Sequence, residues 1–153
     1  MKDRSEIVVP VTVLPDGEGL AMPAYATPGA VGCDLRAAIG ADLTITPGGR
    51  TLVPTGIAVA IPEGYEGQVR IRSGLAHDKG LALLNAPGTI DSDYRGEIRV
   101  ILANLGTEPV TLQRGDRIAQ LVFAPVARAR FERVRELPPS AREGGGFGST
   151  GRT

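Results

Sequence analysis

The segment Gln68-Val69-Arg70-Ile71-Arg72 alternates polar and apolar residues. Successive side chains of a β-strand point to opposite faces, so this pattern is typical of a strand with one face in a core and the other in solvent. Arg72 then shares the polar face with Arg70 and Gln68. The segment therefore predicts a strand whose end presents cationic groups outward.

Short β-branched segments recur along the chain between turn signals. They are Ile7–Leu14, Leu43–Thr46, Thr51–Ile61, Gln68–Arg72, Glu97–Asn104, Val110–Leu112, Ile118–Val126 and Ala129–Arg135. One short helix is expected after Arg72, with Ser73 as its N-cap and Gly80 as its stop. No longer amphipathic pattern appears, which disfavours βαβ units. We therefore expect an all-β sandwich or barrel.

The composition fits a single domain, since 153 residues leave little room for a second core. The chain has 21 Gly and 12 Pro, an excess that fits many tight turns between short strands. With no Trp, 3 Phe and 3 Tyr, the core must consist of Val, Ile, Leu and Ala. Any aromatic residue outside a strand therefore needs another explanation.

Charge and cysteine usage exclude several classes of protein. The 17 basic and 17 acidic residues cancel, which argues against a nucleic-acid polymer as partner. Cys33, the single cysteine, excludes an intramolecular disulfide and a cysteine-rich zinc site, so we interpret it as a small buried filler. The first residues lack the apolar stretch of a signal peptide, and no apolar run approaches about 20 residues. We expect a soluble, cytoplasmic protein with no membrane partner.

The chain changes character after Leu137. Residues 138–153 are rich in Gly and contain one large apolar side chain, Phe147. We interpret residues 1–137 as the β-core and 138–153 as a flexible C-terminal arm. A lone Phe is costly to leave in water and useful as a lid that stacks on a planar ligand. An ordinary flexible tail is the alternative.

Arg72, Ser73 and Gly74 combine groups that suit phosphate oxygens at the expected start of the helix. Arg offers charge-assisted bidentate hydrogen bonds, Ser a hydroxyl, and Gly an unobstructed backbone N–H. The alternative is an ordinary helix cap beside a surface Arg. The string by itself therefore suggests a phosphate site without establishing one.

The segment Gly88–Gly96 places two carboxylates and a Tyr between a turn and a clear strand. A carboxylate at a rigid strand end can orient and deprotonate a water molecule. A solvated hairpin is the alternative, because Asp and Ser are usual turn residues. Spacing does not decide between Asp91 and Asp93 as the functional acid.

Two further strings set a polar residue among apolar neighbours. Asp34 lies within Gly32–Arg36, and Gln120 interrupts an apolar strand after the turn at 114–117. A Gln that faces inward there needs a hydrogen-bond partner, although a turn followed by a strand explains either string. The only histidine, His77, is expected on the surface without a role, which argues against a Ser-His-Asp or Cys-His catalytic arrangement.

Taken in order, five strings resemble the motifs of the trimeric dUTP pyrophosphatases. They are Gly32–Leu35, Arg72–Ala76, Gly88–Glu97, Arg114–Gln120 and Gly145–Gly151. Five ordered motifs over nearly the whole chain are a specific match. The resemblance implies a distorted jelly-roll subunit and a homotrimer with three active sites, each shared among the chains. It also implies hydrolysis of dUTP to dUMP and pyrophosphate, which keeps uracil out of DNA and supplies dUMP for thymidylate synthesis.

The resemblance assigns roles around the triphosphate. Asp91 orients and deprotonates the water that attacks the α-phosphorus, while Asp93 has no secure role. Mg2+ is the implied cofactor, held mainly by the triphosphate and its own waters with no direct protein ligand. Asp34 acts on the water shell of the metal and on the local charge network. Phosphate contacts are implied for Arg72, Ser73, Gly74, Gln120, Arg142 and Ser149.

The resemblance also assigns roles around the nucleoside. A tight hairpin reads the uracil edge through an amide side chain and nearby backbone, and rejects cytosine and the thymine methyl group. Its positions are Asn85, Gly88, Thr89 and Ile90. Tyr94 packs under the deoxyribose and leaves no space for a ribose 2′-hydroxyl. Phe147 and Gly148 belong to the arm that closes over the uracil from another subunit.

Two other interpretations remain open. A dCTP deaminase of the same fold shares the phosphate-binding strings, although the segment Asp91–Tyr94 and the Phe-bearing arm fit the pyrophosphatases. A regulatory trimer could bind dUTP without hydrolysing it, although the intact Asp91 argues against that. One departure is Ile71, which stands where many relatives have Pro before the Arg-Ser-Gly string.

Overall fold

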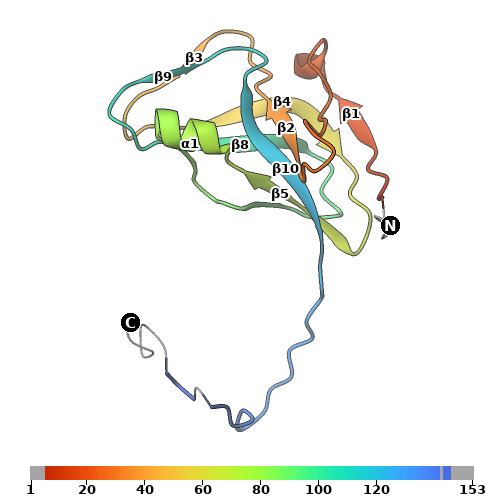
Figure 1. The fold of residues 1–153 in the computed structure, drawn as a ribbon. Helices are drawn as coiled ribbons and strands as arrows, with labels where there is room; N and C mark the ends of the chain where they lie inside the picture. The colour runs from red at the N-terminus through yellow and green to blue at the C-terminus, as the bar shows by residue number, and fades with distance from the viewer. Residues whose placement is uncertain (1–5, 142, 146–153) are drawn as a thin grey trace.

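Two four-stranded antiparallel sheets form the body of the molecule in the computed structural model, which describes residues 6–141 and 143–145 (Figure 1). The first sheet has the order β1 (Val11–Val13), β4 (Arg50–Val59), β8 (Glu97–Asn104) and β6 (Leu81–Leu83). The second has the order β2 (Gly32–Arg36), β10 (Arg117–Pro125), β5 (Tyr65–Arg70) and β7 (Gly88–Ile90). A third, two-stranded sheet pairs β3 (Leu43–Ile45) with β9 (Val110–Leu112). This all-β architecture confirms the fold class that the recurring strand segments predicted.

The core is aliphatic, as the composition predicted. Strand β8 shows the underlying alternation, since Ile98, Val100 and Leu102 are fully buried while Arg99 between them is exposed. Leu121 of β10 is buried in the same cluster. Each such side chain contributes about 1.5–3 kcal/mol when it leaves water. Packing of this kind holds rigid the strand ends from which the polar residues project.

Asn104 is the fully buried polar residue at the end of β8. Its Nδ2 donates hydrogen bonds to the carbonyl oxygens of Ile45 (2.9 Å) and Glu108 (2.8 Å). Its Oδ1 accepts from the backbone N–H of Gly106 at 2.9 Å. These bonds satisfy the amide and offset its desolvation. Asn104 thus ties the β8–β9 turn to β3.

Two glycines meet where β4 is irregular. Gly56 has φ 68° and lies at the register shift between Pro54 and Ala58. A Cβ on Gly56 would lie 2.5 Å from the Gly17 nitrogen, and a Cβ on Gly17 would lie 2.9 Å from the Gly56 carbonyl carbon. Both positions therefore require glycine, and the contact holds the turn η1 (Pro15–Gly17) against β4.

Helical structure among the described residues is confined to η1 and α1 (Ser73–Lys79). Gly80 ends α1 with φ 66° and donates its N–H to the Leu75 carbonyl, which confirms the predicted stop. The predicted cap was wrong by one residue. Extended backbone continues through Arg72, which becomes the N-cap, so Ser73 is already helical and makes no capping bond. Within the described ranges, no helix is long and apolar enough to cross a membrane.

Some predicted strand boundaries were wrong. The first strand covers only Val11–Val13, because Val11 pairs with Val59 at the end of β4 and Pro10 has no N–H to extend the ladder. The strands β2, β6 and β7 were not among the predicted segments. Neither β2 nor β6 contains a β-branched residue, and β7 has only two, after a glycine. Residues 129–135, which the sequence predicts as a strand, have no ladder partner and form none.

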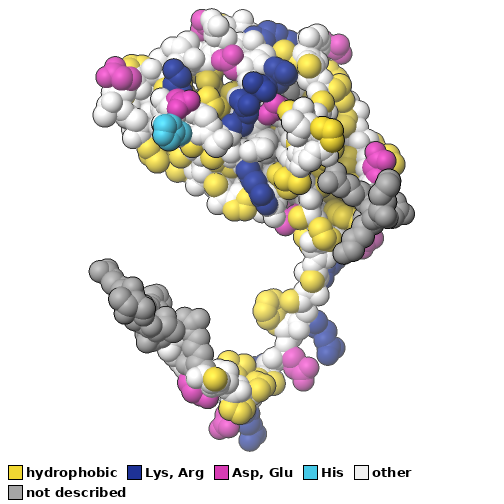
Figure 2. Space-filling model, in the orientation of Figure 1, with side chains coloured by type: hydrophobic (Ala, Val, Ile, Leu, Met, Phe, Trp, Pro, Cys, Tyr) yellow, Lys and Arg dark blue, Asp and Glu magenta, His cyan; other side chains and the backbone are white. Residues whose placement is uncertain are grey.

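The chain leaves the body after β10 as a long extended tail (Figure 1). Every residue from 125 to 141 is exposed, including Phe131 at 96% and Leu137 at 83%. Hydrophobic side chains lie along this tail in Figure 2. Exposed apolar side chains of this kind commonly mark a surface that packs against a partner.

Candidate active site

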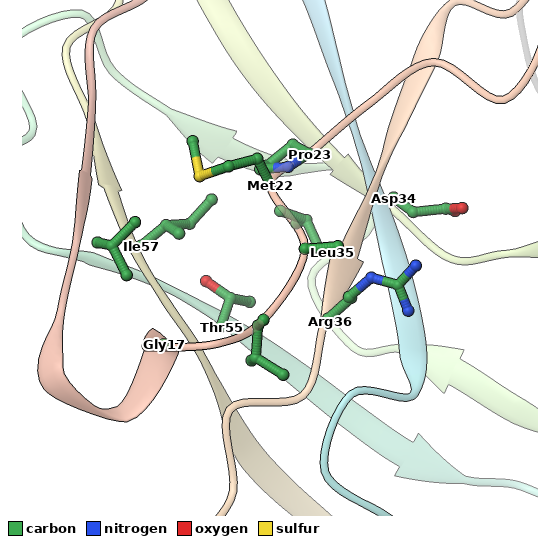
Figure 3. A pocket seen from close by; sticks show the side chains of 11 residues that line it. Gly17, Met22, Pro23, Asp34, Leu35, Arg36, Thr55 and Ile57 are labelled. Atoms are coloured by element: carbon green, nitrogen blue, oxygen red, sulfur yellow. The ribbon is translucent and has the colours of Figure 1, made fainter.

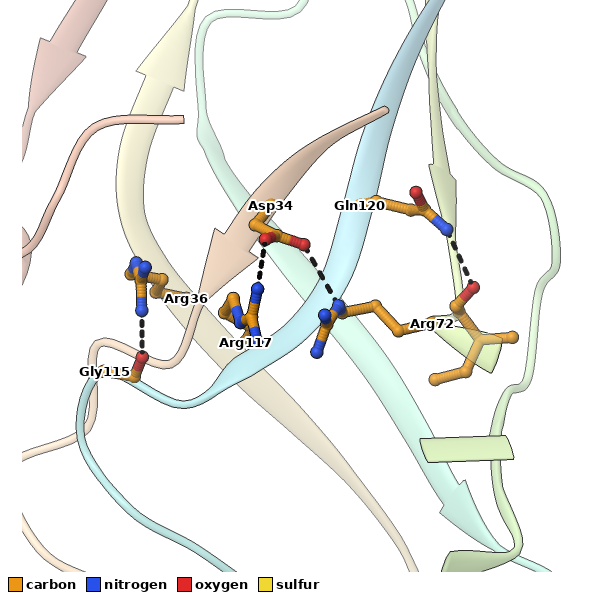
Figure 4. A network of polar contacts seen from close by, with 7 residues as sticks. Asp34, Arg36, Arg72, Gly115, Arg117 and Gln120 are labelled. Carbon is orange, nitrogen blue, oxygen red and sulfur yellow. Dashed lines mark hydrogen bonds and ion pairs between the residues drawn. The ribbon is translucent and has the colours of Figure 1, made fainter. Parts of the chain in front are cut away.

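Asp34 is the centre of a cluster of charges on the second sheet (Figure 4). Its Oδ1 lies 3.0 Å from Arg72 Nε, and its Oδ2 accepts a hydrogen bond from Arg117 Nη1 at 3.2 Å. Both arginines remain partly exposed, at 30% and 46% of their side chains. One carboxylate thus orients two guanidinium groups, and the net positive charge left over suits an anionic ligand.

Gln120 of β10 lies beside this cluster and pairs with Asp34 of β2 and Arg70 of β5. Its side chain is half-buried, and its Nε2 donates to the Ile71 carbonyl at 3.4 Å. That bond is the partner that an amide within an apolar strand requires. The sheet therefore brings Asp34, Arg72 and Gln120 together.

Ser73 and Gly74 open α1 and are both exposed. The Ser73 hydroxyl is not engaged in capping. It follows Arg72 directly in the chain, so it lies next to the Asp34 cluster. The guanidinium, the hydroxyl and the glycine backbone therefore still lie together, although the helix begins at Ser73 and not after it.

A hydrogen-bonded loop follows β7 and contains Asp91. Tyr94 N–H donates to the Asp91 carbonyl at 3.1 Å, and Tyr94 Oη donates to the Glu97 carbonyl at 2.9 Å. Arg95 Nη1 donates to the carbonyls of Ser92 (2.7 Å) and Tyr94 (2.9 Å). Asp91 is itself exposed. The loop thus presents a solvent-accessible carboxylate on a closely tied backbone.

Glu97 fastens this loop to the first sheet. Its Oε1 accepts the Gly56 N–H at 2.9 Å, and its Oε2 accepts from Arg99 Nε at 2.8 Å. The carboxylate is only 13% exposed. The irregular part of β4 and the Asp91 loop are therefore joined through one residue, whose side chain binds Gly56 and whose backbone carbonyl accepts from Tyr94.

The turn between β6 and β7 carries the remaining predicted nucleoside contacts. It is not the predicted hairpin, because β6 pairs with β8 in the first sheet and β7 with β5 in the second. Asn85 is exposed at its tip, and the Ala86–Pro87 peptide bond is cis. A Cβ on the buried Gly88 would lie 3.3 Å from Asn85 Nδ2, so the amide packs against bare backbone. Thr89 is exposed and Ile90 is half-buried.

The register of β5 and β7 separates the predicted site into two parts. Gly88 pairs with Val69 and Ile90 with Gly67, so Asp91 follows the end of β7 that is remote from Arg70. Arg72 lies beyond Arg70, at the opposite end. Positions 66 to 70 alone span about 13 Å along a strand. The cationic cluster and the Asp91 loop of one chain therefore lie at opposite ends of this strand pair.

Arg142, Phe147, Gly148 and Ser149 lie outside the described residues. Among the residues that are described, no three His, Cys, Asp or Glu side chains gather in a way that could hold a metal ion. Two cavities border β2. One, of about 10 Å3, lies behind the cluster, and the charged ends of Asp34 and Arg36 point away from it (Figure 3). It has room for about one water molecule.

The larger cavity, of about 870 Å3, is a mostly apolar groove that shares Met22 and Pro23 with the smaller one. Val9, Val11, Tyr65 and Phe123 are among its lining residues. Cys33 also lines it and is buried, as predicted, and burial raises the pKa of this thiol. This groove lacks the charged groups of the Asp34 cluster.

The sequence did not identify Arg117 or Arg95 as functional. Both lie inside motif strings, but the sequence around an Arg in a turn does not show which distant residue it will contact. Arg114, in the same string as Arg117, instead donates to the carbonyls of Asp16 and Glu18 and supports the η1 turn. Only the folded chain separates these roles. His77 is exposed and bonds only to the neighbouring Asp78 among the described residues, in keeping with its predicted lack of a role.

Comparison with known proteins gives a consistent result. The dUTPase family model matches residues 18–151. A deoxyuridine 5′-triphosphate nucleotidohydrolase of Rhizobium etli (strain CIAT 652) is 59% identical over 140 residues, 90% of each chain. One of Anaplasma marginale (strain St. Maries) is 54% identical over 94% of this chain and 97% of its own. The structure of a Staphylococcus bacteriophage 80alpha dUTPase with dUpNHpp superposes with a TM-score of 0.85 at 25% identity, over 94% of this chain and 98% of that one. This chain belongs to the dUTPase family.

Proposed function

We propose that this chain hydrolyses dUTP at the α-phosphorus, giving dUMP and pyrophosphate. The observation that carries the proposal is the pairing of a cationic cluster, organised by Asp34, with a separate tied loop that presents Asp91. The first suits a polyphosphate and the second suits activation of water. A relative that shares more than half of its sequence is a nucleotidohydrolase of dUTP.

In this mechanism the phosphate chain binds at Arg72, Ser73, Gly74 and Gln120. The Arg72 guanidinium keeps donors free after its Nε has bound Asp34, and these can form charge-assisted hydrogen bonds with phosphate oxygens. The Gln120 amide and the Ser73 hydroxyl supply neutral donors. Such contacts stabilise negative charge that develops as the pyrophosphate leaves.

Asp91 accepts the proton of the attacking water. It is exposed, so water reaches it, while hydrogen bonds of its loop hold the backbone that carries it. Orientation and proton acceptance together account for the usual size of general-base effects. The attack forms an oxygen–phosphorus bond at the α-phosphorus and breaks its bond to the bridging oxygen of the pyrophosphate.

The nucleoside occupies the β6–β7 turn and the loop after β7. The Asn85 amide and the backbone of Gly88, Thr89 and Ile90 read the uracil edge, and Tyr94 excludes a ribose 2′-hydroxyl. A polar site of this kind discriminates strongly, because the wrong base leaves buried donors and acceptors without partners. The exposed Asn85 in a single chain would be covered only when the nucleotide and the arm are in place.

We further propose that the active unit is a homotrimer with shared sites. The two parts of the site lie at opposite ends of the β5–β7 pair within one chain, so the cluster of one copy would meet the Asp91 loop of another. The exposed tail also supports a trimer, because it extends away from the body of its own chain. The arm, with Arg142, Phe147, Gly148 and Ser149, would close over a site on a neighbouring copy.

Mg2+ is the proposed cofactor, and the residues present fit a metal that is bound through the substrate. Both oxygens of Asp34 are bound by guanidinium groups but can still accept hydrogen bonds from metal-bound waters. Mg2+ keeps several waters and commonly binds phosphates, where it neutralises charge. A dUTPase of phage phi11, whose structure at 24% identity shares the fold, coordinates a structural Mg(II) ion.

The decisive test is hydrolysis of dUTP in H2 18O with Mg2+. Attack at the α-phosphorus places the label in dUMP, whereas attack at the β-phosphorus places it in pyrophosphate. Label in pyrophosphate, or tight binding without turnover, would contradict the proposed reaction. Ammonia release from dCTP would instead identify a deaminase.

A second experiment tests the shared site. Asp91→Asn chains mixed with chains that end at Ala141 should regain activity, because some mixed sites combine an intact Asp91 with an intact arm. Sedimentation of an active monomer would refute the trimer.

A further inference from the structure

Gly96 is a glycine for a reason other than its backbone conformation. Its φ lies outside the left-handed region, so any residue could adopt it. A Cβ added there would lie 2.6 Å from Tyr94 Cζ and 3.0 Å from Tyr94 Cε2, and would also touch Oη. Real Cβ contacts are not this short. The missing side chain of Gly96 is therefore what makes room for the Tyr94 ring.

The ring and the backbone of Tyr94 are held by different groups. The backbone is fixed by Tyr94 N–H to Asp91 and by Arg95 Nη1 to the Tyr94 carbonyl. The ring is fixed by its Oη bond to the Glu97 carbonyl and by contact with Gly96. A methyl group at position 96 would therefore displace the ring and leave the path of the loop intact.

We propose that Gly96 is a positioning residue that seats the Tyr94 ring and thereby sets discrimination between dUTP and UTP. The inference rests on the proposed function, in which Tyr94 excludes the 2′-hydroxyl. A filter of this kind works only if the ring cannot retreat. The Oη bond to Glu97 anchors the ring on one side, and Glu97 is itself anchored to Gly56 on the first sheet.

The displacement costs little stability, which makes the role measurable. Tyr94 is 43% exposed, so its ring can swing into solvent without disturbing the core. The atoms that a Cβ would meet belong to this one side chain and not to backbone. A change at Gly96 should therefore appear in substrate selectivity and hardly in the melting temperature.

The experiment compares Gly96→Ala with Gly40→Ala, using the full chain. Gly40 is the matched control, because its φ is also ordinary and a Cβ there meets nothing within 4 Å. The measurement is kcat/KM for dUTP and for UTP. We expect Gly96→Ala to lower the dUTP/UTP ratio about tenfold, within the range typical for one small group in a pocket, and Gly40→Ala to leave it unchanged. An unchanged ratio in Gly96→Ala would overturn the inference.

A double-mutant cycle tests whether Gly96 acts through the ring. In a Tyr94→Ala background the change Gly96→Ala should have no further effect on the ratio, and an additional full-sized loss would refute the inference. If Tyr94→Ala alone leaves the ratio unchanged, the sugar-filter role of Tyr94 fails, and the selectivity role of Gly96 fails with it. If Tyr94→Ala collapses the ratio while Gly96→Ala preserves it, only the inference about Gly96 fails.

Ring position can be followed without any activity. The chain has 3 Tyr, so 13C-tyrosine NMR gives few signals, and Tyr94 is identified by its loss in Tyr94→Ala. We expect the Tyr94 ring signals to shift in Gly96→Ala and to stay in place in Gly40→Ala. Unmoved ring signals would contradict the seating role whatever the kinetics show.

Discussion

The Asp91 loop and the C-terminal tail both serve the proposed reaction, but they are held in opposite ways. The loop is closed by its own hydrogen bonds and fastened to the first sheet through Glu97. The tail is exposed along its length and ends its contact with the body after β10. The difference indicates that folding sets the positions of the chemical groups of the body, whereas the proposed closure of the arm would require the ligand and another copy of the chain.

The largest loss of turnover should come from a change in the Asp91 loop. Asp91→Asn keeps the backbone bonds but cannot accept a proton from water, so we expect turnover to fall by roughly 10²- to 10⁴-fold. The Kd for dUTP and the melting temperature should stay near those of the parent chain. Near-normal turnover would show that the loop does not supply the base.

Removal of the arm should give the next largest effect. A chain that ends at Ala141 loses the proposed phosphate donors and the exclusion of water, so we expect kcat/KM for dUTP to fall by about a hundredfold or more. The melting temperature should hardly change, because the tail beyond β10 is exposed. If the truncation unfolds the body, the arm contributes to the stability of the fold, and the difference drawn between the loop and the tail is wrong.

A single ring of the arm should have a milder effect. Phe147→Ala removes the proposed stacking on uracil, which is worth about 1–3 kcal/mol for a base on an aromatic side chain. We therefore expect kcat/KM to fall by about tenfold to a hundredfold. The comparison with the truncated chain separates the ring from the phosphate donors, and equal losses in both would leave the donors without a role.

The smallest effect should come from the anchor between the loop and the sheet. Glu97→Gln keeps an oxygen acceptor for Gly56 N–H but loses the charge that strengthens this bond. We expect the free energy of unfolding to fall by about 0.5–1 kcal/mol, as for one weakened hydrogen bond. Denaturant titration measures it. A loss of several kcal/mol would mean that the loop contributes to the core.

The sequence predicted most of the fold because long strands carry a period that local reasoning detects. Glu97–Asn104 and Val110–Leu112 were predicted with the bounds that the structure has. The strands β2, β6 and β7 were not among the predicted segments, because β2 and β6 contain no β-branched residue and β7 has only two after a glycine. Residues 129–135 alternate like a strand but have no ladder partner among residues 6–141 and 143–145, and a strand exists only with a neighbour.

The site was predictable in its residues but not in its geometry. The motif strings indicated Asp34, Arg72, Asp91 and Gln120, and the structure joins three of these in one cluster. The roles of Arg117 and Gly96 depend on contacts that no linear pattern encodes. The Asp34 cluster and the Asp91 loop lie at opposite ends of the β5–β7 pair because of the register of these strands, and the sequence alone does not show that register.

The contact between Gly17 and Gly56 also limits how this chain can change over generations. Either glycine, replaced alone, would force a new methyl group onto the backbone of the other, and Gly56 would also lose its left-handed conformation. No order of single steps leads from this pair to two larger residues without a damaged intermediate. Any lineage that abandons the pair must first have rebuilt β4 and the η1 turn, so both glycines should persist long after surface positions have drifted.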